Sequence, residues 1–317
     1  MSERRFHVDP DITVAQTLDK AFYLDGAVWH ATREQIFATA WHWLGPLGDV
    51  AEPGSLAPHA LLPGLLDEPV LLARDVGGTL RCLSNVCTHR AKLLIDAPCK
   101  ADQIRCGYHA RRFELDGRLR FMPGFEGARN FPSASDDLPQ LAFGEWAGHG
   151  FTSINPRWPL DTWLGDLRQR LAWLPMHSWR ADESRSRSFE FDAHWALYVE
   201  NYLEGLHIPH VHPGLNQALD MANYRYELGT ASVLQLALAR DGEAAFEPPP
   251  GTPEHGQHVA AYYAWLFPNL MFNVYPWGLS VNVVQPLSRL YSKGRYSPQH
   301  ERGTHHFHRL VGACLKG

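Results

Sequence analysis

Two short stretches that each hold one cysteine and one histidine constrain this chain more than any other feature of its sequence. The first reads Cys-Thr-His at residues 87–89, and the second reads Cys-Gly-Tyr-His at residues 106–109, with sixteen residues between them. Each stretch offers one thiolate and one imidazole. We therefore expect two matched loops that bind one metal centre through four ligands, namely Cys87, His89, Cys106 and His109.

This set of ligands suits two kinds of metal centre. A Rieske [2Fe-2S] cluster takes two cysteines on one iron and two histidines on the other, and a structural zinc ion accepts the same four ligands in a tetrahedron. Zinc-finger spacing pairs cysteine with cysteine and histidine with histidine, whereas each stretch here carries one of each, as a cluster needs when each loop must reach both irons. The spacing favours a Rieske cluster and leaves zinc as the alternative.

The segments beside the two stretches predict β-hairpins. Residues 70–86 read as two apolar strands around a Gly-Gly turn, and residues 112–121 read as two strands around an Asp-Gly turn. We expect these hairpins to hold the two loops against one metal centre.

A second set of candidate ligands lies in residues 195–213. Apolar residues recur there at helical spacing and leave a polar side that includes Glu204 and His207. Because Pro209 disfavours helical geometry in the residue before it, we expect the helix to break there and the chain to turn His212 back toward His207.

Two imidazoles with a carboxylate from elsewhere in the chain form the facial triad of non-haem iron(II) oxygenases. The alternative is that these histidines are ordinary polar residues of a helix end, since short motifs carry a risk of false matches. The iron site is favoured because a Rieske cluster supplies electrons that only an acceptor site can use.

Length and composition predict an ordinary globular protein with two domains. The chain has 317 residues, of which 45% are hydrophobic and 20% charged, and one core seldom grows beyond about 250 to 300 residues. The net charge of −5 gives no reason to expect nucleic acid as a partner. Prolines and asparagines interrupt the longest apolar stretch and the first residues lack an apolar run, so we expect a soluble cytoplasmic protein with no membrane segment.

Both motifs resemble those of the Rieske non-haem iron oxygenases, the family of ring-hydroxylating α subunits. Similar chains read Cys-x-His-Arg-Gly at the first stretch and Cys-x-Tyr-His-Gly-Trp at the second, whereas this chain has Ala91 for the first glycine and Ala110-Arg111 for Gly-Trp. Residues 200–212 are similar to the mononuclear-iron motif of the same family, Glu-Asn-x-x-Asp/Glu-x-x-His-x4-His.

The resemblance implies a role for each matching residue. The four ligands of the two loops would hold a [2Fe-2S] cluster. His207 and His212 would bind an Fe(2+) ion, and Glu204 would transfer electrons by bridging to a cluster histidine of a neighbouring subunit in a homotrimer. Electrons from NAD(P)H would arrive through a separate reductase or ferredoxin, and O2 would hydroxylate a small organic substrate by mono- or dioxygenation.

The same resemblance implies an α+β fold with three parts. Residues 1–40 would form an N-terminal helical segment that packs on the catalytic domain, residues 41–155 an antiparallel β Rieske domain, and residues 156–317 the catalytic mononuclear-iron domain. The Rieske domain would be inserted in the catalytic domain, whose curved antiparallel sheet would wrap around helices.

The third iron ligand of the family has no evident counterpart in this sequence. In similar chains it is a carboxylate on a helix after the last long strands, but here residues 279–287 run almost directly into residues 289–298, and the only acid after Glu254 is Glu301. We therefore expect an internal C-terminal segment to be lacking and the chain, as given, to be a weak oxygenase. A truncated relative that only transfers electrons or binds a ligand, and a zinc-stapled structural protein, are the alternatives.

Overall fold

The computed structural model describes residues 6–300 and contains two compact units. Residues 38–157 form the inserted unit, so called because the other unit takes residues from both sides of it in the sequence. The flanking unit contains the described residues up to Phe37 and from Trp158 onward. Antiparallel strands and short helices make up both units, so the predicted α+β fold class is confirmed.

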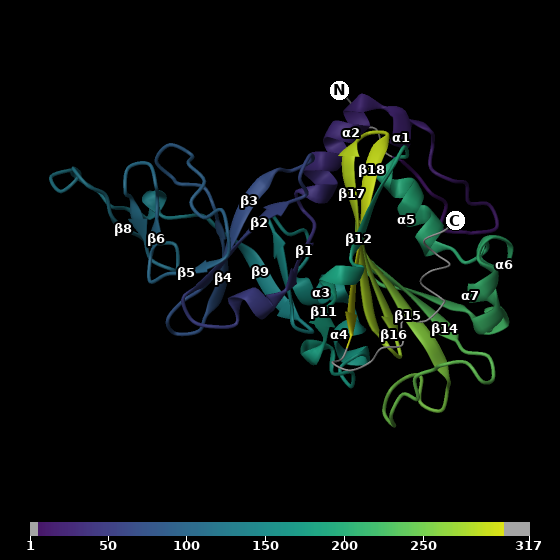
Figure 1. Ribbon diagram of the computed structural model, residues 1–317. Helices are drawn as coiled ribbons and strands as arrows, with labels where there is room; N and C mark the ends of the chain where they lie inside the picture. Colours follow the sequence, from purple (N-terminus) through teal and green to yellow (C-terminus); the bar gives the residue numbers. More distant parts are fainter. Residues whose placement is uncertain (1–5, 301–317) are drawn as a thin grey trace. The chain divides into compact units, whose positions relative to one another are not determined.

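The inserted unit is built from two antiparallel sheets (Figure 1). The larger sheet has the order β1 (His42–Pro46), β10 (His149–Ser153), β9 (Gln140–Trp146), β4 (Leu80–Ser84), β3 (Glu68–Arg74), β2 (Ser55–Leu61) and β5 (Cys99–Lys100). The smaller sheet contains β6 (Ile104–Arg105), β7 (Arg112–Phe113) and β8 (Leu119–Phe121), and the unit also holds the short helices η2 (Leu47–Val50) and η3 (Ala134–Asp136). Both predicted hairpins are confirmed, as β3–β4 and as β7–β8. The chain between them contains the first ligand loop, residues 87–92, and the second ligand loop, residues 106–111.

The two ligand loops are closed by the same pair of backbone hydrogen bonds. In the first loop the N–H of Cys87 donates to the carbonyl five residues later at 2.9 Å, and the N–H of Ala91 donates back to the carbonyl of Cys87 at 3.0 Å. In the second loop the corresponding bonds start at Cys106 and Ala110 and measure 2.8 and 3.1 Å. Each loop is therefore one turn that starts at its cysteine and returns to it.

This turn needs a left-handed backbone at its fifth residue. Ala91 has φ +53° and Ala110 has φ +55°, a region that costs an L-residue roughly 1–2 kcal/mol and costs glycine little. The family pattern has glycine at both positions. The two alanines are therefore strained residues in otherwise regular loops.

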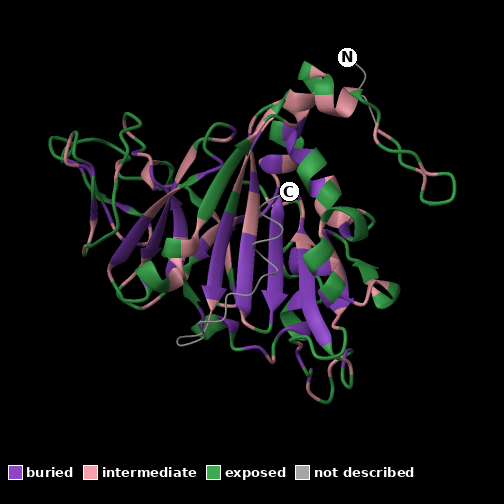
Figure 2. Cartoon of the chain, turned by 45° about the vertical axis from the view of Figure 1, so that its right-hand side comes forward, coloured by how far each residue is buried: buried purple, intermediate pink, exposed green. Residues whose placement is uncertain are grey.

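The flanking unit contains a larger antiparallel sheet with helices along one face (Figure 1). Its strand order is β11 (Arg180–Ala181), β18 (Tyr291–His300), β17 (Gly278–Ser288), β16 (Leu270–Tyr275), β15 (Val259–Leu266), β14 (Ser232–Leu238) and β13 (Arg225–Leu228), and β12 (Arg187–Phe191) also pairs with β18. The helices on that face are α5 (Trp195–Leu203), α6 (Ile208–Val211) and α7 (Pro213–Ala218). Every residue of β16 is buried, so the middle of the sheet is covered on both faces (Figure 2).

The other helices of the flanking unit are short. They are α1 (Ala21–Leu24), α2 (Gly26–Thr32), η1 (Arg33–Phe37), α3 (Leu160–Leu164), α4 (Leu167–Arg170), η4 (Met176–Ser178), η5 (Glu183–Arg185) and η6 (Met221–Asn223). Within residues 6–300, no helix has the length and apolar character that crossing a membrane requires.

Strands β17 and β18 form a tight hairpin where the family is expected to have a longer connection. Ser288 pairs with Tyr291, so only two residues make the turn, and the pairing continues to Leu279 opposite Gln299. The structure thus agrees with the sequence expectation that these two pieces follow each other directly.

The predicted end of the ligand-bearing helix is wrong by several residues. Helix α5 ends at Leu203, because Glu204 has extended backbone angles (φ −124°, ψ +150°). Pro209 lies in the first turn of α6 instead of ending α5. Proline suits a first turn, because the N–H that it lacks has no helical partner there.

His194 joins the N-terminal segment to the start of α5. Its side chain is 1% exposed, and its Nδ1 accepts the N–H of Ala196 at 3.2 Å as the N-cap of the helix. The rings of Phe22, Tyr23 and Trp29 pack around the imidazole. Burial lowers the pKa of His194 to about 4, so the imidazole stays neutral in the folded protein near pH 7.

This burial predicts a loss of stability in mild acid. An unfolded histidine takes up a proton below about pH 6.5, whereas folded His194 resists protonation until about pH 4. The contribution of neutral His194 to the free energy of unfolding is therefore complete above pH 6.5 and is lost as the pH falls toward 4. The linkage is worth up to about 1.4 kcal/mol per pH unit. We expect His194→Asn, which keeps a cap acceptor, to lose less unfolding free energy than wild type between pH 7.5 and pH 5 in urea titrations. Equal losses in both proteins would contradict this.

The strained alanines predict stabilising substitutions. Ala91→Gly and Ala110→Gly should each raise the free energy of unfolding by about 0.5–1 kcal/mol, because the relief of left-handed strain exceeds the entropic cost of glycine. Ala101→Gly in the same unit is the control and should destabilise the chain, since Ala101 is absent from the left-handed residues. Denaturant titrations of the three variants measure the effect, and a destabilised Ala110→Gly variant would show that the strain argument fails.

Candidate metal centres

The ligand loops bring the four candidate cluster ligands together. The thiols of Cys87 and Cys106 lie within hydrogen-bonding distance of each other, and both residues are almost fully buried. The rings of His89 and His109 have centroids 4.8 Å apart and meet edge to face. Two buried thiols and two partly exposed imidazoles thus face one another across the two loops.

The donors of this first centre fit a [2Fe-2S] cluster. Two thiols on one side and two imidazoles on the other match the two irons, and the Nδ1 of His89 is a buried nitrogen with no hydrogen-bond partner among the described residues. Burial, followed by the charge of His109, lowers the pKa of His89, which favours the neutral imidazole that a metal binds.

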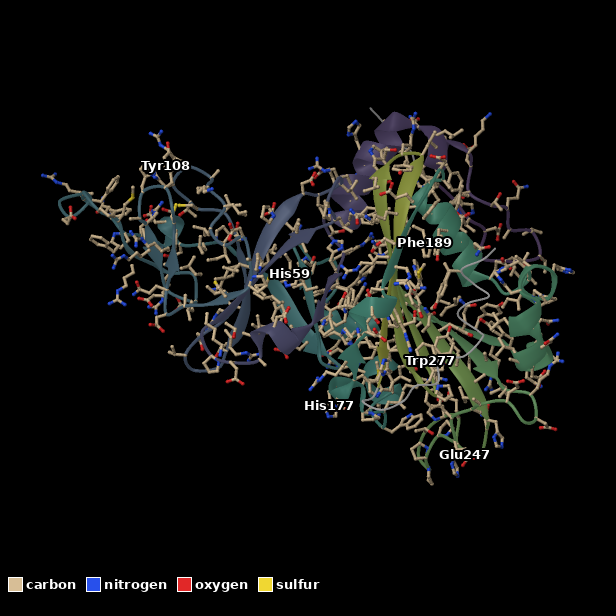
Figure 3. All side chains as sticks on the ribbon, viewed as in Figure 1. His59, Tyr108, His177, Phe189, Glu247 and Trp277 are labelled. Atoms are coloured by element: carbon tan, nitrogen blue, oxygen red, sulfur yellow. The ribbon has the colours of Figure 1, made fainter. Side chains whose placement is uncertain are left out.

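The loops sit on an apolar core that fixes the two cysteines. Cys87 and Cys106 belong to one buried cluster with Ile104, Phe113 and neighbouring leucines. The hairpins supply most of these apolar side chains. The outer side of the loops is open, because Tyr108, labelled in Figure 3, is 59% exposed. Its ring lies against that of His109, with centroids 3.8 Å apart.

The second centre is formed around α6. His207 precedes the helix and His212 follows it, which brings their ring centroids to 5.0 Å. Glu204 fixes the first of these rings: its Oε1 lies 2.5 Å from Nδ1 of His207, and its Oε2 accepts the N–H of Leu206 at 2.5 Å. A carboxylate on Nδ1 leaves Nε2 of His207 available to bind a metal.

His212 has two features that are expected of a metal ligand. Its Nδ1 is buried and has no hydrogen-bond partner in the described part of the chain. Burial, followed by His207, lowers the pKa of His212, and the neutral imidazole is the form that binds iron. The structure therefore brings His207 and His212 together, as expected from the sequence, and places Glu204 against His207.

A third iron ligand is not evident. Among residues 6–300, no further His, Cys, Asp or Glu side chain joins His207 and His212 to complete a three-ligand site for a single metal ion. Glu254, the last acid before Glu301, is 1% exposed and pairs with the Nε of Arg170 at 3.0 Å, away from the histidines. Glu301 itself lies outside the described residues.

A cavity of about 360 Å³ opens beside the two histidines. Its wall includes six tyrosines, one acid, four amide side chains and no lysine or arginine among the described residues. The lining residues are Tyr198, Asn201, Tyr202, Glu204, His207, Ile208, Val211, His212, Leu215, Tyr224, Gln235, Tyr263, Asn273, Tyr275, Ser280, Asn282 and Tyr296.

Hydrogen bonds within the protein fix the polar part of this wall. Gln235 donates to the carbonyl of Tyr202 at 2.6 Å and accepts from the hydroxyl of Tyr224 at 3.0 Å. The hydroxyl of Tyr202 donates to Asn273 at 2.7 Å. Burial raises the pKa of Tyr202 and Tyr224, so both phenols stay neutral. These two phenols therefore add no charge to the wall.

Sequence reasoning found only part of this cavity. Of the aromatic residues between Tyr262 and Tyr275, only Tyr263 and Tyr275 line the cavity, and Tyr262 and Phe272 are fully buried. Strand alternation was the available signal, because Tyr263 pairs across the sheet with Asn273 and shares its face. Tyr202 of α5 also lines the cavity, and the sequence did not indicate it because a tyrosine suits a core as well as a wall.

Comparison with known proteins identifies both halves of the chain. The family described as Rieske [2Fe-2S] domain matches residues 41–132, and the family described as ring hydroxylating alpha subunit (catalytic domain) matches residues 171–289. The two matches together span more than half of the chain.

Several relatives cover most of the chain. The carnitine monooxygenase oxygenase subunit of Acinetobacter pittii (strain PHEA-2) is 29% identical over 275 residues, which are 86% of this chain and 71% of the relative. The chloroplastic choline monooxygenase of Arabidopsis thaliana is 26% identical over 295 residues, covering 88% of this chain and 67% of the relative. A solved quaternary ammonium Rieske monooxygenase is 25% identical with a TM-score of 0.74, covering 90% of this chain and 76% of that chain. The chain therefore belongs to the Rieske non-haem iron oxygenases.

Proposed function

We propose that this chain is the oxygenase component of a monooxygenase that acts on a small quaternary ammonium cation without a carboxylate. As a Rieske oxygenase, it receives electrons from a reductase, and its [2Fe-2S] cluster passes them to a mononuclear iron that activates O2 to hydroxylate a small organic substrate. The observation that carries the substrate class is the cavity wall, with six tyrosines and no lysine or arginine among its described residues.

The roles of the ligand residues are part of this proposal. The two ligand loops hold the cluster through Cys87, His89, Cys106 and His109. His207 and His212 hold the iron, and Glu204 orients His207 and bridges to a cluster histidine of a neighbouring subunit in a homotrimer. The support is the burial of the thiols, the proximity of each histidine pair and the contact of Glu204 with His207.

Tyrosine rings favour a cation in this cavity. A quaternary ammonium group cannot donate a hydrogen bond, so it is best held by the faces of aromatic rings. The relatives named above include carnitine and choline monooxygenases. Carnitine carries a carboxylate, and the described wall has no lysine or arginine that could pair with it. Choline has no carboxylate and therefore fits the wall better.

Several narrower expectations stay predictions. They are the domain boundaries at residues 40 and 155, the cytoplasmic location, and the weak oxygenase activity expected when two imidazoles bind the iron without a carboxylate as third ligand. A monooxygenase is preferred over a dioxygenase because of the named relatives.

A binding experiment tests the substrate class. Choline should bind the full chain at least 10-fold more tightly than its uncharged carbon analogue, 3,3-dimethyl-1-butanol, a difference of about 1.4 kcal/mol. Choline should also bind more tightly than carnitine. Calorimetric titration with the three compounds measures this. Tyr263→Leu should weaken choline binding, and Tyr263→Phe, which keeps the ring face, is the matched control. Equal affinity for choline and its analogue would refute a cation site.

A second experiment tests Glu204. Glu204→Gln keeps the size of the side chain but loses the charge that holds His207, so both metals should stay bound while oxidation of the reduced cluster in a single turnover slows by roughly 10- to 100-fold. Glu200→Gln is the control, because Glu200 accepts the hydroxyl of Tyr23 at 2.5 Å and does not line the cavity. Loss of the mononuclear iron with unchanged cluster oxidation would assign Glu204 a different role.

A further inference from the structure

A buried guanidinium lies beside the cluster loops. Arg111 is 3% exposed, its Nη2 donates to Oδ1 of Asp136 at 2.7 Å, and its guanidinium packs against the rings of Phe113 and Phe131. Arginine keeps its charge in any protein environment. The inserted unit thus holds a permanent positive charge in its interior, where a charge is costly unless it is paired.

The charge belongs to the second ligand loop itself. The carbonyl of Arg111 accepts the N–H of Cys106 at 2.8 Å, which closes the loop. Phe113, on which the guanidinium packs, shares the apolar cluster that contains Cys87 and Cys106. The guanidinium therefore lies against the apolar core that contains the two thiols, and Arg111 stands where the family pattern has an uncharged tryptophan.

The partner carboxylate connects both ligand loops. The backbone carbonyl of Asp136 accepts the hydroxyl of Thr88, in the first loop, at 2.6 Å, and its side chain pairs with Arg111 at the end of the second loop. Ser133 holds the carboxylate from the other side, with its N–H 3.0 Å from Oδ2. Asp136 is thus fixed between the two loops by hydrogen bonds to each of them.

The two charges are unequal in their exposure. The side chain of Arg111 is 4% exposed and that of Asp136 is 24% exposed. Solvent screens an exposed charge more than a buried one, so the positive end of the pair acts more strongly on the interior of the unit.

We propose that Arg111 raises the reduction potential of the [2Fe-2S] cluster and that Asp136 offsets part of this effect. This rests on the proposed cluster ligands. Reduction adds one electron from the reductase to the cluster and therefore one negative charge, which a nearby cation stabilises and a nearby anion destabilises. The ion pair sets how readily the cluster accepts that electron.

Potentiometric titration of the anaerobically purified full chain, followed by visible absorbance, tests the pair. Arg111→Met removes the cation and should lower the one-electron equilibrium constant for reduction at least tenfold, about 59 mV. Asp136→Asn removes the anion, keeps an acceptor for Ser133 and should shift the potential upward. Shifts of the reduction potential in opposite directions would indicate an effect of charge, whereas a general loosening of the loops would shift the potentials of both variants in the same direction.

The matched control is Arg112→Met. Arg112 is the next residue, is exposed and packs on Phe121, so its charge is screened and its removal should leave the potential unchanged. The shifts at Arg111 and Asp136 should persist in 0.5 M salt, since buried charges are screened least.

Each outcome separates the tuning role from the cluster assignment. If wild type binds no [2Fe-2S] cluster, the ligand assignment fails. If the cluster forms and neither variant shifts, or both shift alike, the ligands stand and the tuning role is refuted. If Arg111→Met does not fold, Arg111→Lys, which keeps the charge, should retain the wild-type potential. The upward shift expected in Asp136→Asn then decides whether the ion pair tunes the potential.

Discussion

The backbone hydrogen bonds that close the two ligand loops are the interaction on which the inserted unit depends. Each turn starts at a cysteine, returns to it and ends before a strand or a loop that packs on the same apolar core. Because both turns have the same geometry, two loops of different sequence present matched thiols and imidazoles. The strained alanines at φ +53° and +55° show that this geometry is kept even where the side chain disfavours it.

In the flanking unit, strand pairing and the bend of the chain at Glu204 fix the positions of the cavity residues. Strands β14, β15 and β16 alternate their side chains, which brings Gln235, Tyr263 and Asn273 to one face of the sheet. Gln235 and Asn273 then hold Tyr202 of α5 by hydrogen bonds, so the helix is fixed above the cavity. The helix ends at Leu203, and Glu204 turns the chain so that both histidines face the same space.

Much of this could be read from the sequence, and the rest depended on contacts between distant residues. Spacing predicted the cluster ligands, and turn residues predicted both hairpins. The end of α5 was misjudged because Pro209 was taken as the end of one helix when it begins another. Asp136 lies 25 residues from Arg111, and no local pattern indicates that such residues pair. The cavity tyrosines were ambiguous because a tyrosine is equally suited to a core and to a wall.

The two centres differ in how the protein arranges charge around them. Beside the cluster loops, a buried cation is held by one carboxylate and by two aromatic rings. Beside the two histidines, the described wall carries phenols and amides, of which Gln235 and Asn273 donate within the protein, and Glu204 is its only acid. With no lysine or arginine among its described residues, the wall offers a positively charged group six tyrosine rings and the Glu204 carboxylate.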